Sequence, residues 1–218
     1  MEQALDSKQP PKPLLYDLAG PAVPKEARLF LLAQAIATRT PDFFAIKGAG
    51  AGDKASNVFM AQLRKAAADL FEFDFSEKRV CREARFALDF YFTDEATAVE
   101  VALSLRNSSS EYERDIFKCL LARDEGCKVT QLVFITKPGG HRRCKQRPGA
   151  PAIERYLSRT HGLEIEIREL NDGWADARAA IESLARGQLM RSREEKELPL
   201  NAGRLCSIVS TVLAQPIL

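Results

Sequence analysis

Histidine and closely spaced cysteine pairs are scarce in this sequence, and their scarcity limits its metal chemistry. The 218 residues include two histidines, His141 and His161, and five cysteines. None of the cysteines falls in the C-x-x-C spacing of zinc-binding motifs. We therefore expect neither a zinc site nor a disulfide framework, and free thiols fit the reducing cytoplasm.

Long apolar runs and a strong excess of one charge are also missing. No apolar run approaches the roughly 18 residues that a membrane span needs. Met1–Asp6 lacks the basic and apolar regions of a secretion signal. The formal net charge of +2 gives no general affinity for nucleic acid, so only a local basic cluster could provide one. We expect a cytoplasmic protein without a membrane partner.

The composition that is present is that of an ordinary globular protein. Hydrophobic residues make up 45% and charged residues 28%, and the length suffices for one sizeable α/β domain. Prolines gather in residues 1–24, which predicts an extended arm. The single domain is expected over residues 25–190. Residues 191–218 then form a charged connector and an apolar segment, Leu205–Leu213, that packs on the domain or on a partner.

Hydrophobic periodicity predicts alternating helices and strands along the domain. Helices are expected at Lys25–Thr38, Ala55–Phe71, Glu111–Arg123, Ala152–His161 and Trp174–Met190. Strands are expected at Phe86–Phe92, Thr97–Leu105, Val129–Thr136 and Leu163–Leu170, with a short strand between Phe73 and the first of these.

The two strands Phe86–Phe92 and Thr97–Leu105 read as a hairpin. Both are rich in aromatic and β-branched residues. Asp94–Glu95 is the turn candidate, although it lacks the glycine of the tightest turns. Centring the hairpin there pairs Asp89 with Glu100. One face then carries only apolar bulk, namely Phe86, Leu88, Phe90, Phe92, Val99, Val101, Leu103 and Leu105.

The opposite face of this hairpin places Asp89 and Glu100 side by side. Like charges directly opposed on a sheet are destabilising, so such a pair is usually neutralised by a proton, a base or a metal ion. Small residues leave space around the two acids, and two carboxylates in such a space suit Mg²⁺. The alternative is an exposed strand face, or a pair answered by a base such as Arg85. The small residues are Ala87, Ala98 and Ala102.

The helix predicted at Glu111–Arg123 begins with a capping box, Ser110 to Glu113. At about 100° per residue, Glu113 falls inside the apolar stripe and is the acid that faces the sheet, unless capping is its only role. Asp115 and Lys118 fall on the opposite side and point away from the sheet. The apolar stripe consists of Tyr112, Ile116, Phe117, Cys119 and Leu120.

Two segments could contact phosphate groups. The glycine-rich segment Lys47–Ser56 resembles a Walker A loop, but Asp53 stands where that motif needs its lysine, so nucleotide hydrolysis is rejected. Lys47 and Lys54 could still hold a phosphate at the start of the following helix; the alternative is a loop capped by Asp53. The second segment is a loop over residues 141–148 with four bases and no acid, which favours phosphate contacts or is simply solvated. Its bases are Arg142, Arg143, Lys145 and Arg147.

The order helix, strand, hairpin, helix, strand, with paired acids across the hairpin, resembles the core of the PD-(D/E)xK nuclease superfamily. The resemblance covers roughly residues 55–136. Asp89 matches the first acid of the motif and Glu100 the second. The motif places a lysine two residues after the second acid, and this chain has Ala102 there. Some restriction enzymes carry Gln or Glu at that place, but alanine offers no polar group.

The resemblance implies a restriction-endonuclease-like fold, a three-layer α/β/α core with a central mixed sheet in αβββαβ order. It implies a metal-dependent endonuclease or related phosphodiesterase that acts on nucleic acid, with DNA the first expectation. Asp89 and Glu100 would hold Mg²⁺ or Mn²⁺, and Glu113 or Glu83 would complete the shell. A homodimer is left open. The alternatives are a degenerate nuclease fold that binds nucleic acid without cutting it, and a protein-interaction subunit.

Overall fold

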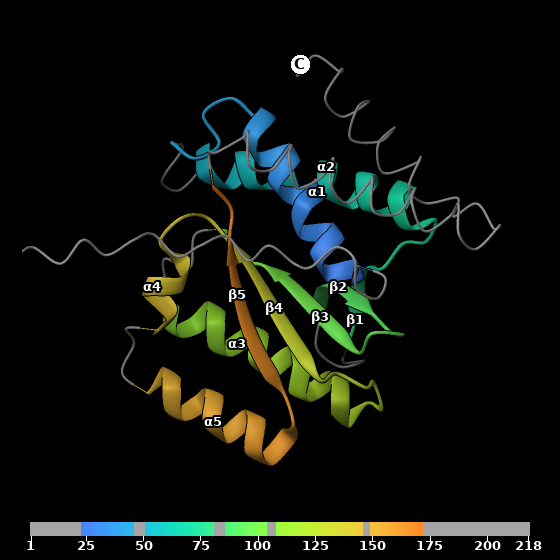
Figure 1. Ribbon diagram of the computed structural model, residues 1–218, viewed down its shortest axis with the longest axis vertical. Coiled ribbons are helices and arrows are strands. Elements are labelled where there is room, and N and C mark those ends of the chain that lie inside the picture. The colour runs from blue at the N-terminus through green and yellow to red at the C-terminus, as the bar shows by residue number, and fades with distance from the viewer. Residues whose placement is uncertain (1–22, 46–50, 81–85, 104–107, 146–148, 172–218) are drawn as a thin grey trace, which may run out of the picture.

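A computed structural model describes residues 23–45, 51–80, 86–103, 108–145 and 149–171 of the chain. Most of the predicted N-terminal arm, the helix predicted at Trp174–Met190 and the apolar segment Leu205–Leu213 lie outside the described residues. The described part is a mixed α/β structure (Figure 1). None of its helices combines the length and apolarity that crossing a membrane requires.

Ten helices and strands are described, and most follow the predicted order. The helices are α1 Lys25–Arg39, α2 Ala51–Phe71, α3 Ser108–Asp124, α4 Gly140–Lys145 and α5 Ala150–His161. The strands are β1 Ser76–Arg79, β2 Ala87–Phe92, β3 Thr97–Val101, β4 Gln131–Thr136 and β5 Glu164–Glu169. The α2 helix begins within the predicted glycine-rich loop, and α3 begins before Ser110, so the predicted capping box is wrong.

The five strands form one sheet in the order β1-β2-β3-β4-β5. Strands β1, β2 and β3 are antiparallel neighbours, whereas β3, β4 and β5 run parallel. The parallel connections pass through α3 and through α4 and α5, as parallel pairing requires. The strands β3, β4 and β5 therefore all end at the same edge of the sheet, beside α4 (Figure 1).

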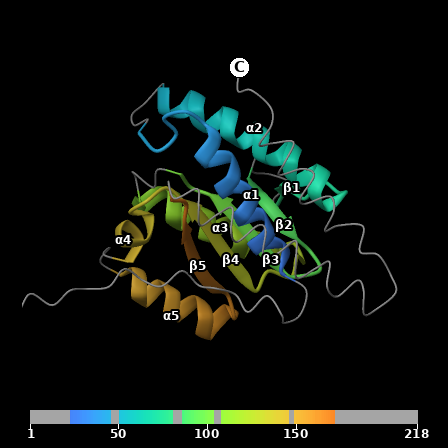
Figure 2. The same ribbon diagram turned by 45° about the horizontal axis from the view of Figure 1, so that its top comes forward.

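Helices cover both faces of the sheet (Figures 1 and 2). The α1 and α2 helices lie on one face, over a core that includes Phe90, Phe92 and Val99. The α3 and α5 helices lie on the other face, over a second core that includes Tyr91 and Phe134. The result is a three-layer arrangement in which alternate residues of each central strand enter different cores.

The predicted hairpin register is confirmed from Phe90 to Phe92, whereas the predicted pair of Asp89 and Glu100 is not part of the ladder. Phe90 pairs with Val99, Tyr91 with Ala98 and Phe92 with Thr97. The connection is longer than a two-residue turn, because residues 93–96 separate the two strands and Ala96 takes a positive φ of 52°. Phe90, Phe92, Val99 and Leu103 are buried in one core, as predicted for the apolar face.

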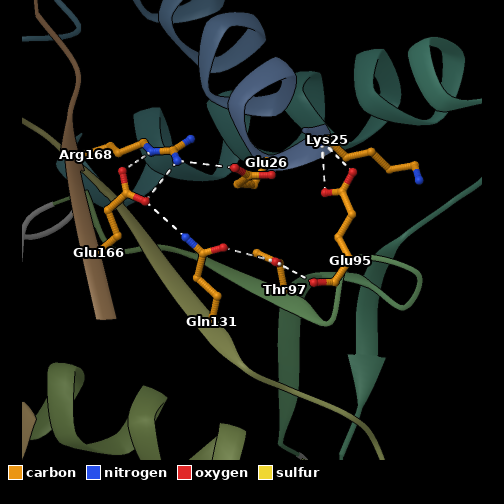
Figure 3. Close-up of polar contacts among 7 residues, drawn as sticks. All are labelled: Lys25, Glu26, Glu95, Thr97, Gln131, Glu166 and Arg168. Atoms are coloured by element: carbon orange, nitrogen blue, oxygen red, sulfur yellow. Dashed lines mark hydrogen bonds and ion pairs between the residues drawn. The ribbon is translucent and has the colours of Figure 1, made fainter. Parts of the chain in front are cut away.

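Seven polar residues form a hydrogen-bonded chain between α1 and the sheet, which we call the α1 network (Figure 3). Pro24 offers no side-chain cap, and both oxygens of the Glu95 carboxylate instead accept the Lys25 backbone N–H at 2.9 Å. This places a negative charge at the positive end of the helix dipole. The members of the α1 network are Lys25, Glu26, Glu95, Thr97, Gln131, Glu166 and Arg168.

Arg168 is the centre of this network. Its guanidinium lies 2.7 Å from Glu166 and 3.3 Å from Glu26, so it joins β5 to α1. The Gln131 amide donates to Glu166 at 3.1 Å, and the Thr97 hydroxyl lies 3.3 Å from the Gln131 amide oxygen. The network therefore connects α1 to β3, β4 and β5 through ion pairs of opposite charge and through hydrogen bonds.

The basic segment after β4 is a short helix rather than the predicted loop. It begins at Gly140, where any side chain would overlap that of Thr136. The His141 backbone N–H donates to the Glu169 carboxylate at 2.6 Å, which fixes the start of α4 to the end of β5. Arg142, Arg143 and Lys145, the bases within α4, consequently lie at the edge where the parallel strands end.

Candidate active site

The pairing between β2 and β3 covers Phe90–Phe92 and stops before it reaches Asp89. Regular pairing extends from Phe92 back to Phe90, and at the next position the Asp89 carboxylate accepts the Val101 backbone N–H at 2.9 Å. An acid side chain therefore takes a hydrogen bond that the strand ladder would otherwise make. Asp89 sits in the fork between β2 and β3, with its side chain 25% exposed.

This separation changes where the first residues of β2 pack. Leu88 is fully buried, but it belongs to the core under α3, together with Phe86, and not to the core of Phe90. The prediction of one unbroken apolar face is therefore wrong for Phe86 and Leu88. The alternation breaks at Asp89, where β2 leaves its pairing with β3 but stays paired with β1 through Leu88 and Ala87.

The second predicted acid, Glu100, lies beneath α3 and is 2% exposed. Lys118 of α3 places its Nζ 3.1 Å from Glu100 Oε2 and 2.9 Å from Asp115 Oδ1. Asp115 and Lys118 are themselves buried. We call the group Asp89, Glu100, Asp115 and Lys118 the acid–lysine site.

The predicted orientation of α3 is wrong. Asp115 and Lys118 face the sheet, whereas Glu113 is exposed and Phe117 is 51% exposed. The helix is rotated so that Tyr112, Ile116 and Cys119 remain buried, and at helical spacing Asp115 and Lys118 share that face. The predicted apolar stripe is displaced because it includes Phe117, which the sheet does not cover.

The predicted open space around the acids is filled. Tyr91 and Ala98 are buried in the core under α3, and the Tyr91 hydroxyl donates to the Lys128 carbonyl at 2.8 Å. The acids are consequently not on an exposed strand face. Their neighbours are buried side chains and two bases, Lys118 and Arg64. Arg85, the base that the sequence suggested, lies outside the described residues.

Arg64 of α2 is the second base, and it approaches Asp89 from the other layer. Its Nη2 lies 3.7 Å from Asp89 Oδ1, and its Nη1 lies 2.5 Å from Glu77 of β1. The Asp89 contact is longer than a normal hydrogen bond, so Arg64 screens this acid without binding it firmly. One third of the Arg64 side chain, 33%, is exposed.

The surroundings of the acid–lysine site disfavour the charged form of the Asp89 and Glu100 carboxyl groups. Burial, followed by the charges of Asp89 and Asp115, raises the pKa of Glu100 well above its ordinary value. Burial also raises the pKa of Asp89, against the Val101 N–H and the charge of Lys118. Burial lowers the pKa of Lys118, but Glu100 and Asp115 outweigh it and the pKa is raised. The two bases therefore compensate the acids only in part.

The donor set fits a hard divalent cation in one respect and falls short in another. Glu100 Oε1 is buried and has no hydrogen-bond partner, which leaves an oxygen available on a carboxyl group that senses the charge of Asp89. Mg²⁺ commonly binds through one or two carboxylates and keeps several waters. Among the described residues, however, no three His, Cys, Asp or Glu side chains are grouped as a metal site. Asp89 and Glu100 are the residues that would hold the ion.

The residues predicted to contact phosphate lie at separate places in the structure, and some of them lie outside the described residues. Arg142 and Arg143 are exposed on α4, and Lys145 is the last residue of that helix. Lys54 is exposed ten residues before Arg64 on α2, about 15 Å away at 1.5 Å per residue. Lys47, Arg147 and Glu83 lie outside the described residues.

Sequence reasoning missed Arg64 and assigned Asp115 and Lys118 to the wrong face of α3. The spacing of Tyr112, Asp115, Ile116 and Cys119 is a regular helical stripe, so Asp115 could have been assigned to the buried face. Buried Lys and Asp are rare unless they are paired. The partner, Glu100, lies on a different element, so a helical wheel of α3 alone could not reveal it.

Comparison with protein-family models, with curated proteins and with solved structures found no match to this chain.

Proposed function

We propose that this chain is a metal-dependent endonuclease or related phosphodiesterase that acts on nucleic acid. The observation that carries the proposal is the position of Lys118, whose Nζ lies 3.1 Å from Glu100. A PD-(D/E)xK site needs two acids and an amine at one place. The strand lacks that amine at Ala102, and α3 supplies one from a position 18 residues after Glu100.

The order of elements supports a restriction-endonuclease-like fold. The chain runs α2, β1, β2, β3, α3, β4, which is the αβββαβ order that the resemblance implies. Asp89 sits where β2 parts from β3, and Glu100 is the penultimate residue of β3. Both acids are thus presented at one edge of a central mixed sheet.

The roles of the residues follow from their charge and burial. Asp89 and Glu100 would hold Mg²⁺ or Mn²⁺, which, when bound, activates a water and offsets charge on the phosphate. Lys118 would orient the attacking water and stabilise charge that develops on the phosphate oxygens. Arg64, which is one third exposed beside Asp89, would bind a phosphate that enters the fork. Glu113 has no role in this scheme because it is exposed on α3.

The substrate is proposed to be DNA or another nucleic acid that lies along the edge where β3, β4 and β5 end. Arg142 and Arg143 are exposed at this edge, on α4, and offer phosphate contacts. Glu100 pairs with Phe134 of β4, and β4 leads directly into α4. Glu100, near the end of β3, and the bases of α4, which follows β4, therefore belong to the same edge of the sheet.

A second candidate is a degenerate nuclease fold that binds nucleic acid or a protein partner without cleavage. The observation in its favour is that Lys118 already occupies the position of a cation between Glu100 and Asp115 and offsets part of their repulsion without a metal. Divalent-metal binding separates the two candidates, because only the nuclease requires it.

The test is a cleavage assay on plasmid and single-stranded substrates, with Mg²⁺ or Mn²⁺ against chelator. We expect metal-dependent cleavage that Glu100→Gln and Lys118→Met each reduce about a hundredfold or more, the usual scale for a positioned catalytic group. Lys128→Met is the matched control, because Lys128 is exposed and uses only its backbone carbonyl to hold Tyr91.

Two results would contradict the proposal. Cleavage that persists in chelator, or in both site variants, would place the activity elsewhere. Nucleic-acid binding without metal binding or cleavage would favour the degenerate fold instead.

A further inference from the structure

Lys118 is held by two carboxylates at once, and this arrangement has a consequence for the metal. Its Nζ lies 3.1 Å from Glu100 Oε2 and 2.9 Å from Asp115 Oδ1, and the side chains of Lys118, Glu100 and Asp115 are 11%, 2% and 5% exposed. Ion pairs in such surroundings are strong, because little solvent screens them. The ammonium therefore occupies one oxygen of a carboxylate that the proposed function assigns to a divalent cation.

We propose that Lys118 is a resident cation that occupies Glu100 in the resting protein, and that Asp115 retains it when a divalent cation takes Glu100. The inference rests on the proposed function, and it describes how the same site is regulated. Lys118 would act twice, first as a competitor of the metal and then as the amine of the loaded site.

The competition follows from the geometry of Glu100. A divalent cation and an ammonium repel each other, so both cannot stay within contact distance of one buried carboxylate without cost. Glu100 Oε1 is the free oxygen at which an ion would enter, since it is buried and has no hydrogen-bond partner. Entry there must weaken the contact of Lys118 with Oε2.

Asp115 is suited to keep Lys118 in place. It precedes Lys118 by three residues on α3, so the two side chains are neighbours on one helix face whatever occupies Glu100. The 2.9 Å contact is already formed in the resting arrangement. Asp115 is thus a positioning residue: it holds the amine near Glu100 without itself being needed as a metal ligand.

The first test measures metal affinity, using titration calorimetry with Mn²⁺ and with Mg²⁺ in the absence of nucleic acid. Lys118→Met removes the competitor, and the double variant Asp115→Asn/Lys118→Met removes it while leaving the net charge unchanged. We expect both variants to bind metal roughly tenfold more tightly than the parent, and Lys128→Met to match the parent within about twofold.

The double variant also guards against a failure to fold. Lys118→Met leaves Glu100 and Asp115 uncompensated, whereas the double variant removes one buried acid together with the base. Long-range electrostatics alone predict no change for the double variant, because its charge is that of the parent. Unchanged or weaker metal binding by this variant would therefore overturn the inference.

The second test examines Asp115 in the presence of nucleic acid. We expect Asp115→Asn to keep metal binding and the KM for nucleic acid, but to lower kcat at least tenfold, because Lys118 is no longer retained. Asp115→Glu should restore part of the loss, since it returns a carboxylate to the same helix face. Parent kcat in Asp115→Asn would overturn the role of Asp115.

The outcomes separate this inference from the proposed function. A parent protein that binds metal and cleaves, beside a double variant that binds no tighter, overturns only the inference. Metal binding that appears solely when Lys118 is replaced supports the resident cation and contradicts the nuclease. Absence of metal binding in all of these proteins overturns both.

Discussion

Two polar clusters, the α1 network and the acid–lysine site, lie on opposite faces of the same sheet, and they differ in how well their charges are satisfied. In the α1 network, the acids meet a helix N-terminus, a guanidinium and an amide (Figure 3). In the acid–lysine site, Glu100 retains an unpartnered oxygen and lies beside two further acids. In the first cluster every carboxylate has a hydrogen-bond donor and only Arg168 Nη1 is left without a hydrogen-bond partner, whereas in the second cluster the unpartnered atom belongs to an acid.

This difference indicates which of the two clusters serves mainly to hold the fold together. A buried charge pair costs desolvation, and satisfied hydrogen bonds only offset that cost. The α1 network offsets it by joining α1 to the sheet. Burial raises the pKa of an acid in both clusters, but the Lys25 backbone N–H opposes this rise at Glu95, whereas Asp89 and Asp115 add to it at Glu100, whose pKa lies well above its ordinary value. Perturbed acids of this kind are concentrated at sites that bind or react.

The largest effect is expected from Arg168→Met, which breaks the α1 network. It leaves the buried Glu26 and the half-buried Glu166 without their base, at a cost of about 3 kcal/mol in the free energy of unfolding. Urea denaturation measures this, and Mn²⁺ binding should be unchanged. Arg155→Met on the exposed face of α5 is the control, within about 0.5 kcal/mol of the parent. An equal loss in both variants would remove the structural role of the network.

The next effect concerns nucleic-acid affinity. Arg142→Ala/Arg143→Ala removes two exposed bases of α4, and the full set with Lys145 and Arg147 removes four. The slope of log affinity against log salt should flatten by roughly 0.7–0.9 for each phosphate interaction that the substitutions remove. Lys128→Ala/Arg159→Ala is a control of equal charge at the opposite edge, where β4 and β5 begin. Equal slopes for the two double variants would mean that α4 is merely solvated.

A smaller effect is a change in the pH dependence of stability. Because the folded protein raises the pKa of Glu100, it binds more protons than the unfolded chain above the ordinary pKa of glutamate. Stability is therefore lost as pH rises from that ordinary value toward the folded pKa. Glu100→Gln should remove this loss, so its stability relative to the parent should improve with rising pH. Parallel pH profiles from chemical denaturation would contradict the unsatisfied character of the site.

The smallest effect is expected from Glu113→Gln. The side chain is exposed on α3, away from the acid–lysine site, so unfolding free energy should change by less than about 0.5 kcal/mol. Metal affinity should be that of the parent. A loss of metal binding in this variant would mean that Glu113 contributes to the metal site, which would contradict the observed orientation of α3.

Much of the fold follows from local pattern. Alternating apolar residues of two facing strands admit only one register without burying the acids in the core of Phe90 and Phe92, and that register is the one observed. The order of helices and strands also follows, because each change of period is visible within a short window. The pattern thereby predicts that Asp89 and Glu100 are neighbours, and the charge of Asp89 does raise the pKa of Glu100, although the ladder ends before the two residues pair.

The tertiary structure decided the rest of the site. The sequence of a helix does not fix which of its faces packs on a sheet. In α3 the packed face includes Lys118 and leaves Phe117 exposed. A lysine is buried in a core only where an acid can pair with it, and Glu100 stands on another element. Likewise, the separation of β2 from β3 at Asp89 depends on a hydrogen bond to Val101 across the fork. These choices are contacts between distant segments, so no periodicity within one segment could reveal them.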